Sequence, residues 1–131
     1  KDKIIAYFSI SLQAIKISEN LSRNQIKNLD GISYQARGKL ITELPALLIG
    51  QLAKNDLYKN FITGELLMEF CMNKYVDGQK LLSGRIIVLE CKNINYLIDN
   101  LYSKFSFKVH ETKDDGLIKL IRVLNERDLI F

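Results

Sequence analysis

The sequence predicts an α/β domain with a mixed, mostly antiparallel sheet flanked by helices. Two observations support this fold class: short, continuously apolar β-branched runs typical of buried strands, and apolar stripes at helical spacing between them. The chain has 131 residues, of which 47% are hydrophobic and 26% are charged, as in an ordinary globular domain. We therefore expect residues 1–131 to form a single domain.

The first half of the chain contains two predicted strands. Residues 4–17 are rich in β-branched and aromatic side chains, which favours extended structure. A polar connection over residues 18–40 follows, with at most a short helix around residues 25–29, and such long connections are usually functional or mobile. An apolar run that we expect to be a buried strand begins at Pro45 and continues to Ala53. A proline is tolerated there because its missing N–H costs little at the start of a strand.

A turn over residues 56–63 leads into a predicted helix over residues 64–75. Met68 and Met72 lie on one side of this helix, opposite its main apolar face. That face is formed by Leu66, Leu67, Phe70 and Cys71. Two apolar faces predict a helix that is covered from two directions.

A buried strand over residues 86–90 precedes the second predicted helix, residues 93–104, which Asn93 caps. At about 100° per residue, Tyr102 and Asn95 fall together on one edge of its apolar stripe. This predicts a half-buried tyrosine whose hydroxyl faces a cleft. The stripe consists of Ile94, Leu97, Ile98, Leu101 and Phe105. A closing β-hairpin follows, with strands at 105–110 and 117–124 and a turn at 113–116.

Cysteines, charge and hydropathy limit the class of protein. Cys71 and Cys91 are too few for a disulfide framework and lack metal-ligand spacing, which predicts reduced core thiols in a cytoplasmic protein. The net charge of +4 suits anionic partners, such as the phosphates of a cofactor or RNA. No apolar run approaches the roughly 18 residues of a membrane span, so we expect no membrane partner. The chain begins with Lys1, so we expect its natural start to lie upstream.

The second helix and its exit resemble the C-terminal motif of the GNAT superfamily of acyl-CoA-dependent acetyltransferases. In that family the motif tyrosine is the usual general acid, which implies this role for Tyr102; simple packing at the helix edge is the alternative. The resemblance implies a pantetheine contact for Asn95, with a solvated asparagine as the alternative. Ser106 departs from the family pattern, which has glycine at the helix exit.

Residues 52–67 are similar to the GNAT cofactor motif, in which a strand leads through an aromatic, basic and glycine-containing loop into a helix. Tyr58, Lys59 and Gly64 match the aromatic, basic and last small positions, whereas Ile62 stands where the family has its first glycine. The resemblance implies acetyl-CoA as co-substrate, with its pyrophosphate at the helix N-terminus and backbone oxyanion donors at the end of the strand. The implied cofactor-binding residues are Leu52, Ala53, Lys54, Lys59, Asn60, Thr63, Gly64 and Asn95.

The strands at residues 7–11 and 44–53 resemble the toxin-like branch of the superfamily. This implies acetylation of the α-amine of aminoacyl-tRNA and a ribbon-helix-helix antitoxin as partner. The resemblance lacks the family's N-terminal strand and helices, so we expect an N-terminally truncated fold. Because residues 4–10 and the helix with Met68 and Met72 look too apolar to face water, we expect a homodimer or a need for upstream residues.

Two further interpretations of the sequence stay open. A degenerate GNAT-fold module without catalysis would act through protein or RNA contacts, and Ile62 and Ser106 favour it. A regulatory RNA-binding α/β domain has only the basic isoelectric point, near 9.0, in its support. No general base is evident, with Glu43, Glu90 and His110 as weak candidates.

Overall fold

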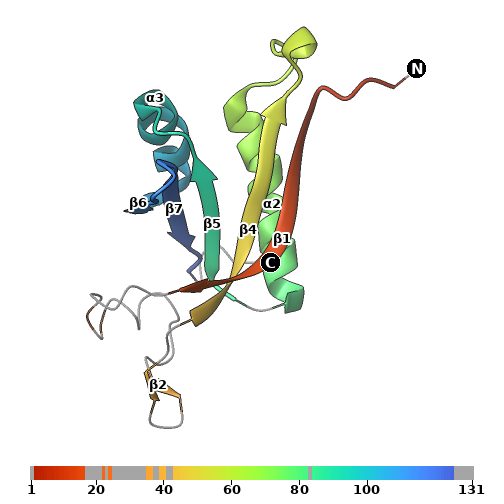
Figure 1. Cartoon of the computed structure of the whole chain (residues 1–131). Helices are drawn as coiled ribbons and strands as arrows, with labels where there is room; N and C mark the ends of the chain where they lie inside the picture. Colours follow the sequence, from red (N-terminus) through yellow and green to blue (C-terminus); the bar gives the residue numbers. More distant parts are fainter. Residues whose placement is uncertain are drawn as a thin grey trace.

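The computed structural model describes residues 2–16, 22, 24, 35–36, 39–40, 43–82 and 84–125. Within these, five strands form one sheet in the order β1-β4-β5-β7-β6 (Figure 1). The strands are β1 (Ala6–Lys16), β4 (Glu43–Lys54), β5 (Ile86–Cys91), β7 (Ile118–Val123) and β6 (Lys108–Thr112). Only the β4–β5 pair within this sheet of described residues is parallel. The mixed, mostly antiparallel α/β fold predicted from the sequence is confirmed.

The polar connection between β1 and β4 contains a separate two-stranded ladder. It consists of β2 (Gln35–Ala36) and β3 (Lys39–Leu40), which pair antiparallel. The short helix predicted around residues 25–29 lies outside the described residues.

A short 3-10 helix, η1 (Asp56–Tyr58), lies in the turn after β4 and has no buried residue. Two longer helical segments of the described chain pack on one face of the sheet. They are α2 (Gly64–Leu82) and a second segment built from α3 (Asn95–Leu97), η2 (Ile98–Tyr102) and η3 (Ser103–Phe105). Both contribute to the core cluster that contains Leu47 and Ile87. Their neighbours on the same two strands, Ala46 and Ile86, point to the opposite face and belong to a second core cluster. β4 and β5 are therefore buried on both faces, as their continuously apolar sequences predict.

The buried face of α2 differs from the predicted one. Met68 is fully buried and Met72 is 7% exposed, so the expectation that this side needs an external cover is wrong. Leu66 and Phe70, predicted on the main apolar face, are 40% and 52% exposed. Apolar residues fill nearly every position from 66 to 72, so their spacing does not determine which arc of the helix meets the sheet. The helix also continues to Leu82, beyond the predicted end at residue 75.

The second helical segment is irregular rather than one capped α-helix. Ile94 is its N-cap residue and provides no side-chain hydrogen bond, so the predicted Asn93 cap is wrong. A π-helical turn occupies Ile98–Tyr102, and the i to i+5 pairing of such a turn shifts the side-chain phase. Tyr102 is therefore buried, at 8% exposure, rather than half buried, while Asn95 is exposed.

Ser106 ends this segment in a left-handed backbone conformation, with φ of 64°. The Ser106 N–H donates to the Ser103 carbonyl, and the Phe107 N–H donates to the Tyr102 carbonyl, which is the hydrogen-bond pattern of a Schellman motif. A side chain at such a position costs conformational energy that glycine avoids.

Replacing Ser106 with glycine is therefore expected to raise the free energy of unfolding by about 1 kcal/mol, measured by urea denaturation. Ser103, with φ of −64°, supplies the matched control. There, Ser103→Gly should lower stability by about 0.5–1 kcal/mol, because a helical glycine loses more backbone entropy on folding. A loss of stability in Ser106→Gly would contradict the assignment of strain to this residue.

The closing hairpin forms around the predicted turn, but its first strand begins at Lys108 rather than at residue 105, because η3 continues to Phe105. Between β6 and β7, the Gly116 N–H donates to the Lys113 carbonyl, and the Asp115 carboxylate accepts a hydrogen bond from the Leu117 N–H. Gly116 has φ of 84°, which this turn requires. This hydrogen bond, together with Lys113, lowers the pKa of Asp115.

Both cysteines are buried and free, as predicted for core thiols. Burial raises the pKa of Cys71 to about 12 and also raises the pKa of Cys91, so both remain protonated at neutral pH. In the described part of the chain, no group of three or more His, Cys, Asp or Glu side chains is placed to hold a metal ion. The described helices include none with the length and apolarity to span a lipid bilayer.

Candidate functional site: a cleft between splayed strands

The parallel strands β4 and β5 pair over only part of their length. Ala46–Ile49 pairs with Ile86–Leu89, whereas β4 beyond Ile49 pairs with β1 alone. The β1–β4 register shifts here, since Ser9 faces Gln51 and Ile10 faces Ile49, which leaves Gly50 as the bulged residue. A bulge bends its strand. Figure 1 shows the two strands close together at one end and apart at the end nearest α3.

A cavity of about 660 Å³ lies between the end of β4 and the α3–η3 segment that follows β5. Its volume is within the range of small-molecule sites. We call it the splay cleft. The end of β4 and the start of α2 form one wall, and the α3–η3 segment forms the other. Its lining residues are Leu52, Ala53, Lys54, Thr63, Gly64, Glu65, Leu67, Tyr96, Leu97, Asn100, Leu101, Tyr102 and Lys104.

The structure brings six of the nine residues singled out from the sequence to this cleft. They are Leu52, Ala53, Lys54, Thr63, Gly64 and Tyr102. Lys59 and Asn60 lie exposed in the preceding turn, and Asn95 lies exposed at the start of α3; none of these three lines the cleft. The expectation that Asn95 shares an edge with Tyr102 assumed a regular helix, and the π-helical turn between them removes that phase relation.

Thr63 and Lys54 shape the loop that leads into α2. The Thr63 Oγ1 accepts a hydrogen bond from the Leu66 N–H at 3.1 Å, so this hydroxyl caps the helix. The Lys54 Nζ donates to the carbonyls of Lys59 and Ile62, at 3.3 and 3.4 Å. The loop therefore closes around the lysine ammonium group. The N–H groups of the first helical residues, Gly64 onward, are of the kind that can bind an anion.

Tyr102 is a buried residue of the opposite wall. Its ring contacts Phe107 edge to face, with 6.5 Å between the ring centroids. Burial raises the pKa of Tyr102, and a smaller contribution comes from Cys91. The phenol is therefore protonated at neutral pH and can act as a proton donor within the cleft.

Sequence reasoning missed several residues of the cleft. Glu65, in the first turn of α2, forms an ion pair with Lys104 of η3, across the two walls. These residues are 39 positions apart, so no local pattern connects them. Tyr96 and Asn100 also line the cleft from the second helical segment, whose π-helical turn leaves no regular helical spacing that would identify them.

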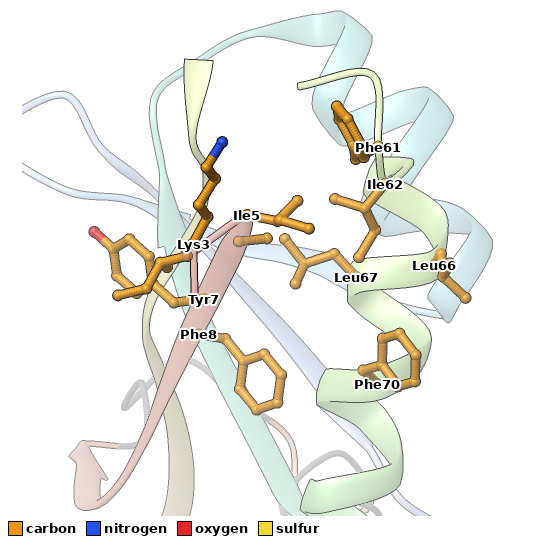
Figure 2. A pocket seen from close by; sticks show the side chains of 11 residues that line it. Lys3, Ile5, Tyr7, Phe8, Phe61, Ile62, Leu66, Leu67 and Phe70 are labelled. Atoms are coloured by element: carbon orange, nitrogen blue, oxygen red, sulfur yellow. The ribbon is translucent and has the colours of Figure 1, made fainter. Parts of the chain in front are cut away.

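A second cavity, of about 670 Å³, lies between the start of β1 and the first turns of α2. It is predominantly apolar, and Figure 2 shows Ile62, Leu67 and Ile5 directed toward one another there. Ile62, which stands where the GNAT family has its first glycine, lines this cavity and not the splay cleft, so its side chain does not crowd that cleft. Among the described non-glycine residues only Ser106 has positive φ, so no left-handed backbone is forced on Ile62.

Apolar side chains around this second cavity and along β1 are solvent-exposed. Ile4, Phe61 and Leu12 are 71%, 73% and 61% exposed. The expectation of exposed apolar surface therefore holds for the start of the chain but not for Met68 and Met72. Self-association or a need for upstream residues stays a prediction.

Ile62→Gly is expected to lower the free energy of unfolding by about 2 kcal/mol, through lost apolar burial and added backbone freedom. It should not tighten binding of a ligand in the splay cleft. Urea denaturation and ligand titration measure the two effects. Leu57, which is 82% exposed, supplies the control, since Leu57→Gly loses mainly the backbone contribution of about 0.5–1 kcal/mol. Tighter ligand binding at unchanged stability would show that the Ile62 side chain does crowd the ligand.

This chain is similar to known proteins in its three-dimensional structure rather than in its sequence. No family profile matches the chain, and no curated protein matches it. Among solved structures, a mutant AtaT toxin matches with a TM-score of 0.60 and 12% identity, covering 91% of this chain and 58% of that chain. The chain thus spans just over half the length of that toxin chain. The fold of the present chain is GNAT-like.

Two other solved structures match more weakly. An acyl-CoA N-acyltransferase from Pseudomonas aeruginosa and Ard1 from Thermoplasma volcanium each match with a TM-score of 0.44 and 12% identity. Both alignments cover 88% of this chain, with 100% and 99% of the other chains. The likeness that concerns the fold of this chain is therefore the one to the toxin chain.

Proposed function

We propose that this chain is an acetyl-CoA-dependent N-acetyltransferase domain that transfers an acetyl group from a thioester to an amine. The observation that carries the proposal is the splay cleft, which places the unpaired edge of β4, the start of α2 and Tyr102 around one cavity. The unpaired strand edge offers backbone groups for amide recognition. The helix start offers N–H donors for phosphate. The residues present therefore fit acetyl-CoA.

Each part of the cleft has a role in the proposed reaction. Acetyl-CoA supplies an activated acyl thioester. Backbone N–H groups near Leu52 and Ala53 donate hydrogen bonds to the carbonyl oxygen, where negative charge develops as the amine attacks. Tyr102 then gives its phenolic proton to the departing sulfur as the C–S bond breaks and the amide bond forms. The proton lost by the attacking amine restores the phenol through solvent, so protons and charge balance.

We propose that the acceptor is an amine, and specifically the α-amine of aminoacyl-tRNA. The net charge of +4 and the resemblance of residues 7–11 and 44–53 to the toxin-like branch of the superfamily support an RNA-linked substrate. An α-amine has a pKa near 8 and needs little help from a base. This agrees with the positions of Glu43, Glu90 and His110, none of which lines the cleft. A cytoplasmic location, a ribbon-helix-helix antitoxin and a homodimer belong to the same proposal.

Thermal melting with acetyl-CoA tests the binding step. Acetyl-CoA at 100 times its dissociation constant should stabilise the fold by about 2.7 kcal/mol. ATP at equal concentration serves as the polyanion control. Thiol release in the presence of aminoacyl-tRNA or simple amines then tests transfer. The absence of any shift with acetyl-CoA would contradict the proposal.

The second candidate is a GNAT-fold module without catalysis, which acts through protein or RNA contacts. The loop before α2 favours it, because the Thr63 hydroxyl and the Lys54 ammonium group are already bound within the protein. Glu65 also places a carboxylate in the first turn of α2, where it repels an anionic ligand. Acetyl-CoA binding without thiol release toward any amine would favour this module over the enzyme.

A further inference from the structure

The two walls of the splay cleft are joined by an ion pair. The Lys104 Nζ donates to the Glu65 Oε1, which links η3 to the first turn of α2. Both residues also line the cleft, as does Tyr102, which is more than nine-tenths buried. A ligand that reaches Tyr102 therefore enters a cleft that this pair spans.

The pair is placed where it can be exchanged. The Lys104 and Glu65 side chains are 58% and 53% exposed, and ion pairs this exposed are weak. The hydrogen bond to Glu65 raises the pKa of Lys104, so the ammonium group stays charged at neutral pH. A phosphate group carries more charge than a carboxylate and has several acceptor oxygens, which makes it the stronger partner for one lysine.

We propose that Glu65 and Lys104 form an exchangeable clasp that selects a polyanionic thioester: Lys104 leaves the Glu65 carboxylate and binds a phosphate oxygen of the entering ligand. The identity of that ligand as acetyl-CoA rests on the proposed function. Glu65 acts as the internal competitor, because its carboxylate occupies Lys104 until a stronger anion arrives. Thioesters without phosphate cannot replace it, so Glu65 is a specificity-determining residue and Lys104 is a ligand-binding residue.

Opposite signs for the two residues test the clasp. In calorimetric titration at low salt, Lys104→Gln should weaken acetyl-CoA binding by about threefold to tenfold, since it removes a cation from an exposed site. Glu65→Gln should tighten binding by about twofold to fivefold, since it removes the competitor. Binding of S-acetylpantetheine, which lacks phosphate, should change less than about twofold in either variant. Both effects should shrink in concentrated salt.

A matched ion pair controls for the loss of surface charge. Lys119 and Glu111, whose side chains are 17% and 48% exposed, form such a pair on the β6–β7 hairpin, outside the splay cleft. Lys119→Gln and Glu111→Gln should leave the affinity for acetyl-CoA unchanged. Urea denaturation of all four variants identifies any that fail to fold.

Each other outcome has a definite meaning. Unchanged acetyl-CoA affinity in Lys104→Gln overturns the clasp and leaves the proposed acetyltransferase intact. Equal weakening by both substitutions also overturns it, since the pair would then only brace the two walls. The expected signs without acyl transfer to any amine support the clasp and overturn the enzymatic proposal alone. A wild-type chain that binds no acetyl-CoA overturns both.

Discussion

Tyr102→Phe is expected to lower the turnover of acetyl transfer by about 10²–10⁴-fold while leaving acetyl-CoA affinity unchanged. The substitution removes only the hydroxyl, and the ring keeps its edge-to-face contact with Phe107. A transition state that needs a proton at the departing sulfur then has no donor on this wall. Thiol release measures turnover, and calorimetry measures affinity.

The pH dependence of turnover gives a second measure of the same role. The reactive form of Tyr102 is the protonated one, and burial raises its pKa above the ordinary value of 10. Activity through this group is therefore present at neutral pH and lost only as pH rises through that higher pKa. Tyr7→Phe, on β1 and outside the splay cleft, is the matched control and should keep wild-type turnover. Full turnover in Tyr102→Phe would reduce this tyrosine to a packing residue.

Met68→Ala is expected to lower the free energy of unfolding by about 2–5 kcal/mol. Met68 is fully buried in the core cluster that joins α2 to the sheet, and truncation leaves a cavity beneath the helix. Because α2 forms part of one wall of the splay cleft, the variant should also bind acetyl-CoA more weakly. Urea denaturation measures the first effect and titration the second.

Leu81 supplies the control on the same helix. It is 85% exposed, so Leu81→Ala should change stability by no more than about 0.5 kcal/mol. A similar loss in both variants would mean that the effect does not come from core packing at Met68. A small loss in Met68→Ala alone would contradict the burial of this side chain.

Local sequence patterns determined where most of the strands and helices lie. The continuously apolar runs in β4 and β5 predict strands buried on both faces, because such runs leave no polar side for water. The turn at residues 113–116 predicts the closing hairpin, because its aspartates and glycine suit a tight reversal. The candidate cofactor loop and Tyr102 are likewise predicted from short motifs, since each motif lies within one stretch of chain.

Local patterns could not determine how these elements meet. The face that α2 turns to the sheet depends on which apolar arc the strands accept, and Met68 rather than Phe70 fills that contact. The inward position of Tyr102 depends on a π-helical turn that periodicity at 100° per residue does not contain. The Glu65–Lys104 pair joins residues far apart in the chain. The sequence by itself determined the elements and the motif residues of the candidate site; only tertiary packing, which acts between distant segments, decided which side chains face one another across the cleft.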